Sequence, residues 1–149
     1  MHLNLQTDYA LRILMALAAS GGQMSVEEIA RSYGVSRNHL AKIAQRLQAM
    51  GYVTASRGRT GGLRLARAPK DVNVGTIVRS LESLNGFVEC LAPTESGCPV
   101  NGLCGLKGAL NAALGDFLAR LDRYTLDDLL PDRNRFFAQL IATRPEIPA

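Results

Sequence analysis

The sequence predicts a mainly α-helical chain in which a tight pair of helices is followed by a short β-hairpin and later by one long helix. Three observations support this prediction. Apolar residues recur at helical spacing in several segments, glycines separate consecutive segments, and a glycine-rich run lies between two short strand-like stretches. The chain has 149 residues, of which 47% are hydrophobic and 20% charged, so it has the composition of a globular protein of about one domain.

The first expected helix runs from about Thr7 to Ser20. Its apolar residues recur at spacings of three and four, which places them on one face. We expect this face to point into the core, and its members are Leu11, Leu14, Met15 and Ala18.

The next two helices are expected to form a helix-turn-helix. Ser25-Val26-Glu27-Glu28 is a capping-box pattern and predicts a helix that ends near Tyr33. Gly34 permits a sharp turn, and Ser36 is a candidate N-cap for a third helix that ends at Gly51. This arrangement is typical of DNA-binding proteins, although a two-helix scaffold without that function has the same pattern.

A basic hairpin is expected to follow the third helix. Residues 52–56 and 63–66 are predicted strands, and the run between them, Arg57-Gly58-Arg59-Thr60-Gly61-Gly62, can bring its backbone close to a phosphate. Together with the three helices, this hairpin predicts a winged helix-turn-helix domain over residues 1–70.

The charge pattern supports a polyanionic partner for this domain. Residues 29–70 contain nine Lys and Arg but no Asp or Glu, whereas the rest of the chain has eight basic and thirteen acidic residues. Double-stranded DNA is favoured over a membrane surface, because the segment has no basic amphipathic helix with bulky apolar anchors. The third helix would enter the major groove, and the wing would contact phosphates or the minor groove; for Ser36 and His39 a role in the helix cap alone is the alternative. The candidate DNA-binding residues are Ser36, Arg37, Asn38, His39, Lys42, Arg57, Gly58, Arg59, Thr60, Gly61 and Gly62.

Residues 71–130 have a different character. Asn73 is expected to cap a connecting helix that ends at Asn85-Gly86, and a loop over residues 85–105 follows. A long helix is expected from about Leu103 to Tyr124, with a broad apolar stripe that belongs either to the core or to a subunit contact. Because DNA-binding proteins commonly bind two half-sites, this stripe favours a dimerisation helix in a homodimer.

Two further expectations concern the C-terminal part. Thr125 and Asp128 predict a short capped helix that ends at Leu130. The tail over residues 131–149 is assigned no structure.

All three cysteines, Cys90, Cys98 and Cys104, lie in the expected loop. Seven and then five residues separate them, which is too wide for a zinc site built on C-x-x-C pairs and fits an iron-sulfur cluster better. Redox thiols, a disulfide with one remaining thiol, and buried small apolar side chains are the alternatives. Three thiolates leave a cluster one ligand short, and the cationic Lys107 is a poor fourth ligand.

Several stretches together resemble the iron-sulfur winged-helix regulators: residues 5–12, the Ser-Arg-Asn-His-Leu-Ala-Lys-Ile run at 36–43, the wing at 57–65 and residues 124–129. Within that superfamily they are most similar to the nitric-oxide-sensing repressors of the NsrR type. The resemblance implies a homodimer that binds operator DNA and responds to nitric oxide. It also implies a 4Fe-4S cluster, with 2Fe-2S as the alternative, held by Cys90, Cys98, Cys104 and Asp8 of the partner subunit. Arg12, one helical turn beyond Asp8, would steady that carboxylate.

Two related types and one other class of protein compete with this interpretation. The IscR type has a histidine three residues after the last cysteine, where this chain has Lys107. The iron-responsive RirA type shares the wide first cysteine gap but lacks the Ser-Arg-Asn-His run, so an iron-responsive or general iron-sulfur-status regulator ranks second. A redox or electron-transfer protein could use the same cluster but has no need of an acid-free segment.

Other functional classes are disfavoured. We expect no enzyme, because no Ser-His-Asp arrangement, phosphate-binding loop or paired-carboxylate site is evident. We expect no membrane association and a cytoplasmic location, because the chain has neither a long apolar stretch nor a secretory signal pattern.

Overall fold

The computed structural model describes residues 3–58, 61–84, 88–91 and 97–142. These residues form two compact units, which we treat separately. The first comprises residues up to 72 together with those from 125 onward, and the second comprises residues 73–124. Helices dominate both, and one two-stranded antiparallel sheet is present in the described part, which confirms the predicted mainly α-helical fold class with a small hairpin. No helix among the described residues is long and apolar enough to cross a membrane.

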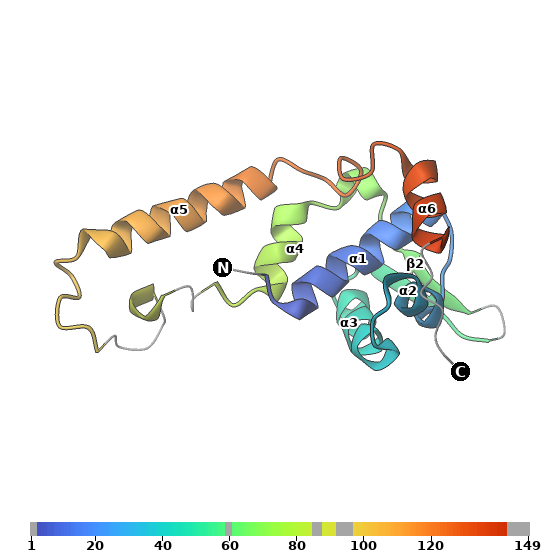
Figure 1. The fold of residues 1–149 in the computed structure, drawn as a ribbon, viewed down its shortest axis with the longest axis horizontal. Coiled ribbons are helices and arrows are strands. Elements are labelled where there is room, and N and C mark those ends of the chain that lie inside the picture. Colours follow the sequence, from blue (N-terminus) through green and yellow to red (C-terminus); the bar gives the residue numbers. More distant parts are fainter. Residues whose placement is uncertain (1–2, 59–60, 85–87, 92–96, 143–149) are drawn as a thin grey trace. The chain divides into compact units, whose positions relative to one another are not determined.

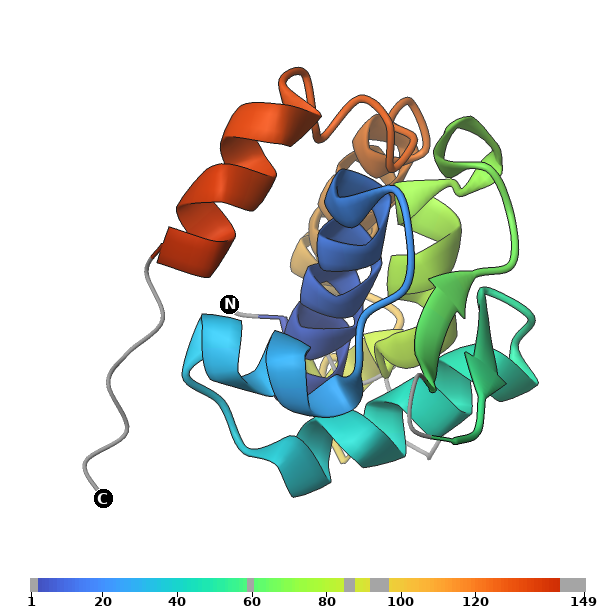
Figure 2. The same ribbon diagram turned by 90° about the vertical axis from the view of Figure 1, so that its right-hand side faces the viewer.

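The first unit is a winged helix-turn-helix. Helix α1 packs against α3, α6 and strand β2, and α2 packs against α3 (Figures 1 and 2). The elements of this unit are α1 (Leu5–Ser20), α2 (Val26–Tyr33), α3 (Arg37–Ala49), β1 (Val53–Ser56), β2 (Gly62–Leu65), a 3-10 turn (Pro69–Asp71) and α6 (Arg133–Ala142).

Local capping determines where α2 and α3 begin. The Glu28 amide donates to Ser25 Oγ at 3.1 Å, and the Ser25 amide donates to the Glu28 carboxylate at 2.7 Å, so the predicted capping box is present. Gly34 ends α2 with a φ of 64°, a conformation that an L side chain rarely adopts. Ser36 Oγ accepts from the His39 amide at 3.5 Å and begins α3. The predicted helix-turn-helix is therefore confirmed.

The core of this unit is built from side chains of α1, α2 and α3. Its largest members are at most 1% exposed, and three of them lie on α1. The predicted inward face of α1 was partly wrong: Leu14 and Ala18 are buried, but Leu11 and Met15 are only half-buried. The helix is covered on more than one side, because α6 packs on it as well, so its buried surface extends beyond one stripe. Among the residues of α1, α2 and α3, the largest fully buried side chains are Ile13, Leu14, Leu17, Ile29, Leu40 and Leu47.

The hairpin pairs Val53 with Leu65 and Ser56 with Gly62. Its second strand also pairs with Met24, whose amide and carbonyl exchange hydrogen bonds of 3.0 and 2.8 Å with Leu63. A Cβ at Gly62 would lie 2.8 Å from the Met24 carbonyl oxygen, so only glycine fits this close approach. The wing is thereby anchored to the segment that precedes α2.

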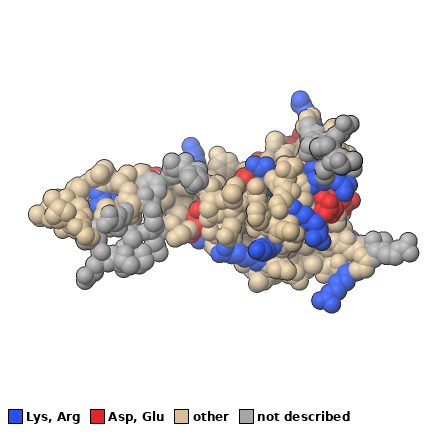
Figure 3. Space-filling view, turned by 60° about the horizontal axis from the view of Figure 1, so that its bottom comes forward, with Lys and Arg blue, Asp and Glu red and all other residues tan. Residues whose placement is uncertain are grey.

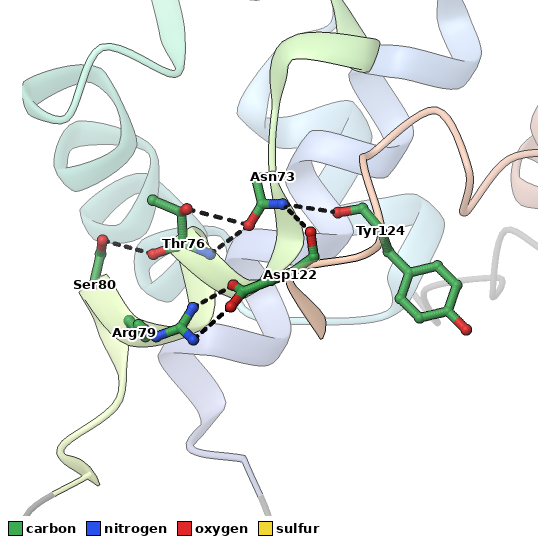
Figure 4. A network of polar contacts seen from close by, with 6 residues as sticks. All are labelled: Asn73, Thr76, Arg79, Ser80, Asp122 and Tyr124. Carbon is green, nitrogen blue, oxygen red and sulfur yellow. Dashed lines mark hydrogen bonds and ion pairs between the residues drawn. The ribbon is translucent and has the colours of Figure 1, made fainter. Parts of the chain in front are cut away.

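The second unit comprises α4 (Val74–Leu81), a 3-10 turn (Glu89–Leu91) and α5 (Gly105–Leu121). Asn73 caps α4 and also donates to the Asp122 carbonyl at 2.7 Å, while Arg79 forms a bidentate ion pair with the Asp122 carboxylate (Figure 4). This hydrogen bond with Arg79 lowers the pKa of Asp122 below its ordinary value. The network fixes the start of α4 to the end of α5.

Three expected helices after residue 72 differ from the prediction. Helix α4 ends at Leu81, because Glu82 has an extended ψ of 141°, and not at Asn85-Gly86, which lies outside the described residues. Helix α5 is shorter at both ends than the predicted 103–124. The helix expected after Thr125 was wrong: Thr125 and Asp128 exchange capping hydrogen bonds, but a turn follows, since Pro131 lacks the amide that would continue a helix.

Helix α6 lies in the tail to which the sequence analysis assigned no structure. Its cap was visible in the sequence as Asp132, whose carboxylate accepts from the Arg135 amide at 2.9 Å. Apolar residues at helical spacing follow, and Leu140 is buried. The residues from 125 onward thus group with the winged-helix unit.

Candidate nucleic-acid interface and metal-ligand loop

The N-terminal turn of α3 presents polar side chains to solvent. Ser36, Arg37, Asn38 and His39 are all exposed, and Lys42 is exposed one turn further on. The opposite face of the helix is held in the core through Leu40 and Leu47. A helix fixed in this way offers donors and acceptors in the geometry that major-groove recognition requires.

Arg37 is the one residue of this group that forms an ion pair within the described part of the chain. Its Nε lies 3.2 Å from Glu27 Oε2, and Arg31 Nη2 lies 3.6 Å from the other oxygen of the same carboxylate. Glu27 lies in the first turn of α2, so the contact joins the two helices of the helix-turn-helix. From the sequence, Glu27 was expected only as part of the capping-box pattern.

The wing is described in part. Arg57 and Gly58 are exposed, and Gly61 and Gly62 are partly covered. The candidate residues Arg59 and Thr60 lie outside the described residues. In the space-filling view, Lys and Arg side chains recur over the face turned forward, while Asp and Glu side chains are visible in a few small groups (Figure 3). The described candidate DNA-binding residues all belong to the first unit.

Asp8 lies in the first turn of α1 and is bound by Arg12. Arg12 Nε donates to Asp8 Oδ1 at 3.1 Å, and Arg12 Nη2 lies 3.0 Å from Oδ2, with both side chains about two-fifths exposed. The guanidinium also lies 5.4 Å from the ring centroid of Tyr33, the last residue of α2. Burial raises the pKa of Tyr33 to about 12, so its phenol stays neutral. Arg12 therefore connects the carboxylate of Asp8 with the helix-turn-helix.

The three cysteines lie in the second unit and none forms a disulfide. Cys90 lies in the 3-10 turn and is half-buried, as is Cys98, whereas Cys104 is exposed at the N-cap of α5. Asn101 donates its amide to the Cys98 carbonyl at 3.1 Å and accepts from Lys107 Nζ at 3.2 Å, which ties the loop to α5. Lys107 is thus used to hold the loop.

Cys90, Cys98 and Cys104 have the chemistry of iron-sulfur cluster ligands. Among the described residues, no three His, Cys, Asp or Glu side chains lie together as a metal site. Unbonded thiols have no mutual attraction that would gather them. Three thiols that are free of disulfides and at least partly accessible nevertheless suit a soft metal centre.

Most residues of α5 are exposed within the described part of the chain. Leu118 is its one buried residue, while Leu106 is 62% exposed and Leu103, just before the helix, is 91% exposed. An apolar surface of this kind is typical of a subunit contact.

A winged helix-turn-helix with an exposed polar turn at the start of its third helix defines a DNA-binding transcriptional regulator. A family model described as "Rrf2: Iron-dependent Transcriptional regulator" matches residues 3–132, and the chain belongs to the Rrf2 family. This confirms the resemblance drawn from the sequence.

Two similar proteins are regulators named NsrR. The chain is 44% identical over 135 residues to the HTH-type transcriptional regulator NsrR of Bacillus subtilis (strain 168), which covers 89% of this chain and 92% of that protein. It is 42% identical over 135 residues to NsrR of Geobacillus kaustophilus (strain HTA426), with the same coverage.

Solved structures agree with the fold. The T. potens IscR structure matches with a TM-score of 0.69 and 27% identity over 91% of this chain and 90% of that one. The structure of CymR, the global cysteine regulator of B. subtilis, matches with a TM-score of 0.67 and 26% identity over 87% of this chain and 95% of that one.

Proposed function

We propose that this regulator is a homodimeric, NsrR-type repressor that releases operator DNA when nitric oxide modifies its iron-sulfur cluster. The observation that carries the proposal is the combination of an exposed Ser-Arg-Asn-His turn on α3 with three disulfide-free loop cysteines in one chain. The 44% identity to a regulator named NsrR supports it. In this proposal residues 1–70 bind DNA, residues 71–130 hold the cluster and the dimer contact, and 131–149 form the tail.

DNA recognition is assigned to α3 and the wing. Residues Ser36 to His39 and Lys42 contact base edges and phosphates in the major groove, and residues Arg57 to Gly62 lie along the backbone or the minor groove. Because phosphate contacts release counterions, Arg57→Ala and Arg59→Ala should each weaken binding to all sequences and reduce the salt slope by about one unit. An unchanged slope in both variants would exclude a phosphate contact by the wing.

The cluster ligands are assigned to Cys90, Cys98, Cys104 and Asp8 of the partner subunit. When bound, a 4Fe-4S cluster supplies iron that nitric oxide can attack. The carboxylate of Asp8 would hold iron less firmly than a thiolate, so it would be the most readily displaced of the four ligands. To serve as a ligand, Asp8 must share its oxygens with Arg12 or leave it, since Arg12 contacts both.

The dimer contact is assigned to the exposed apolar side chains of α5. In such a dimer, the cysteine loop of one protomer and Asp8 of the partner subunit would hold the same cluster, and α1 packs against α3 within each protomer. Movement of α1 would therefore alter the separation of the two α3 helices. A coupling of about 1–3 kcal/mol would change operator affinity by roughly 5- to 150-fold.

The test of the ligand assignment mixes Asp8→Ala and Cys98→Ala proteins under anaerobic conditions. A heterodimer should contain one cluster, because intact cysteines of one protomer meet intact Asp8 of the other, whereas the wild-type dimer should contain two. Native mass spectrometry with iron and sulfide analysis counts them. Heterodimers without a cluster would refute the cross-subunit assignment.

An iron-responsive regulator is the second candidate, and the family description "Iron-dependent" favours it. The two functions are separated by operator binding of the anaerobically purified protein, measured after nitric oxide treatment and, separately, after iron chelation. Release by nitric oxide at full iron content supports the first; release only on loss of iron supports the second.

A further inference from the structure

Glu27 occupies an unusual position beside the surface assigned to DNA. Its carboxylate lies between two guanidinium groups, with Arg31 on its own helix at 3.6 Å and Arg37 at the start of α3 at 3.2 Å. Glu27 and Glu28 are also the last acidic residues before the acid-free segment 29–70. Glu28 serves the capping box, but Glu27 has no such role.

The contact leaves the far end of Arg37 available. Glu27 engages Nε, and no other interaction of the Arg37 side chain is present among the described residues. The side chain is 62% exposed, so Nη1 and Nη2 are available to a ligand. Arginine binds guanine through two parallel hydrogen bonds to O6 and N7. A guanidinium can therefore bind a carboxylate through its Nε edge and a guanine through its terminal edge at the same time.

We propose that Glu27 is a positioning residue that sets the base preference of this regulator by holding Arg37 in the orientation that binds guanine. The inference rests on the proposed binding of α3 in the major groove. Arg31 fixes one oxygen of the Glu27 carboxylate from the same helix, and the other oxygen holds Arg37 across the turn. Side-chain freedom of Arg37 is thus restricted before DNA arrives, which reduces the entropy lost on binding.

A purely electrostatic role of Glu27 predicts a different result. A negative charge beside DNA weakens binding to every sequence alike, because it acts on phosphates. A positioning role acts only at the base that Arg37 contacts. The two are distinguished by base preference, which overall charge does not change.

The experiment uses the full-length, anaerobically purified protein and a library of DNA duplexes with a randomised core. Wild type is compared with Glu27→Gln, Arg37→Ala and the double variant. Glu28→Gln is the matched control, since it removes the same charge one residue away and glutamine can maintain the capping box. Affinities are then measured for the preferred duplex and for its single-base variants, and thermal unfolding verifies that each variant is folded.

Arg37→Ala should abolish the preference for guanine at one position of each half-site. Glu27→Gln should weaken that same preference by about two- to fivefold, the range of an exposed ion pair, while raising affinity for unrelated DNA as Glu28→Gln does. In the Arg37→Ala background, Glu27→Gln should leave base preference unchanged. If Glu27→Gln and Glu28→Gln have equal base preferences while Arg37→Ala has a changed one, the positioning role of Glu27 is refuted and the proposed DNA binding is not. If wild-type protein enriches no duplex from the library, both the proposed function and the positioning role of Glu27 are refuted.

Discussion

Gly75 lies where α4 meets the end of α5, and its replacement by alanine tests this joint. A Cβ at this position would overlap Asp122 Oδ1 and would lie 2.9 Å from the Asp122 amide nitrogen and 3.0 Å from Arg79 Nη1. The side chain of Asp122 could move away, but the backbone nitrogen cannot move without shifting the end of α5. Gly75→Ala should therefore strain the backbone and break the ion pair between Arg79 and Asp122 (Figure 4).

The expected cost follows from two opposing terms. Overpacking at a tight contact costs about 1–3 kcal/mol, and alanine recovers about 1 kcal/mol over glycine inside a helix. With the ion pair lost as well, we expect a net decrease of about 1–2 kcal/mol in the free energy of unfolding. For a chain of this size, that lowers Tm by about 2–8 °C.

Urea titration followed by circular dichroism measures the change. Asp122→Ala removes the nearest atom, so Gly75→Ala should cost less in that background than in the wild type. If Gly75→Ala is as stable as the wild type or more stable, helix propensity outweighs the contact and the reasoning is refuted. Equal costs in the two backgrounds would show that the Asp122 side chain does not contribute.

Three further changes have expected outcomes. Ser25→Ala removes the acceptor of the α2 capping box and should lower the free energy of unfolding by about 0.5–2 kcal/mol in urea titration; an unchanged midpoint at unchanged slope would refute this. Arg79 lowers the folded-state pKa of Asp122, so wild-type stability should fall as pH drops below about 4 and through that lower pKa. Asp122→Asn should lack this part of the loss when both proteins are melted thermally at pH values from 6 to 2. Parallel plots of Tm against pH for the two proteins would contradict this expectation. Leu47→Ala creates a cavity at a residue that is 0% exposed and should cost about 2–5 kcal/mol in denaturant; a loss below about 1 kcal/mol would refute full burial.

Features that depend on neighbouring residues were predictable from the sequence. Ser25, Ser36 and Asn73 each cap a helix within three residues, and Gly34 ends α2 as expected. Capping and turn chemistry act over a single turn, so their signals are complete in a short stretch of sequence. The helix expected after Thr125 does not form although its cap does, because Pro131 is a second local signal that opposes the cap.

Contacts between distant residues were not predictable. Arg79 and Asp122 are 43 residues apart, and nothing in either local sequence indicates the other. The contacts of Arg12 with Tyr33 and of Arg37 with Glu27 likewise depend on how the helices cross. For the candidate site, the residue types and their exposure on α3 followed from the sequence, but the residue that holds Arg37 did not.

The path of the chain makes the second unit an insertion into the first. The Leu126 amide donates to the Val72 carbonyl at 2.8 Å within the first unit, and the Val74 amide donates to the Tyr124 carbonyl at 3.0 Å within the second. The chain thus leaves and re-enters the winged-helix unit at two neighbouring backbone positions. A few residues would suffice to connect Val72 to Thr125 directly, and loop-closure entropy changes by only about 0.6 kcal/mol for each doubling of length. Insertions of very different length are therefore compatible with the same winged-helix unit.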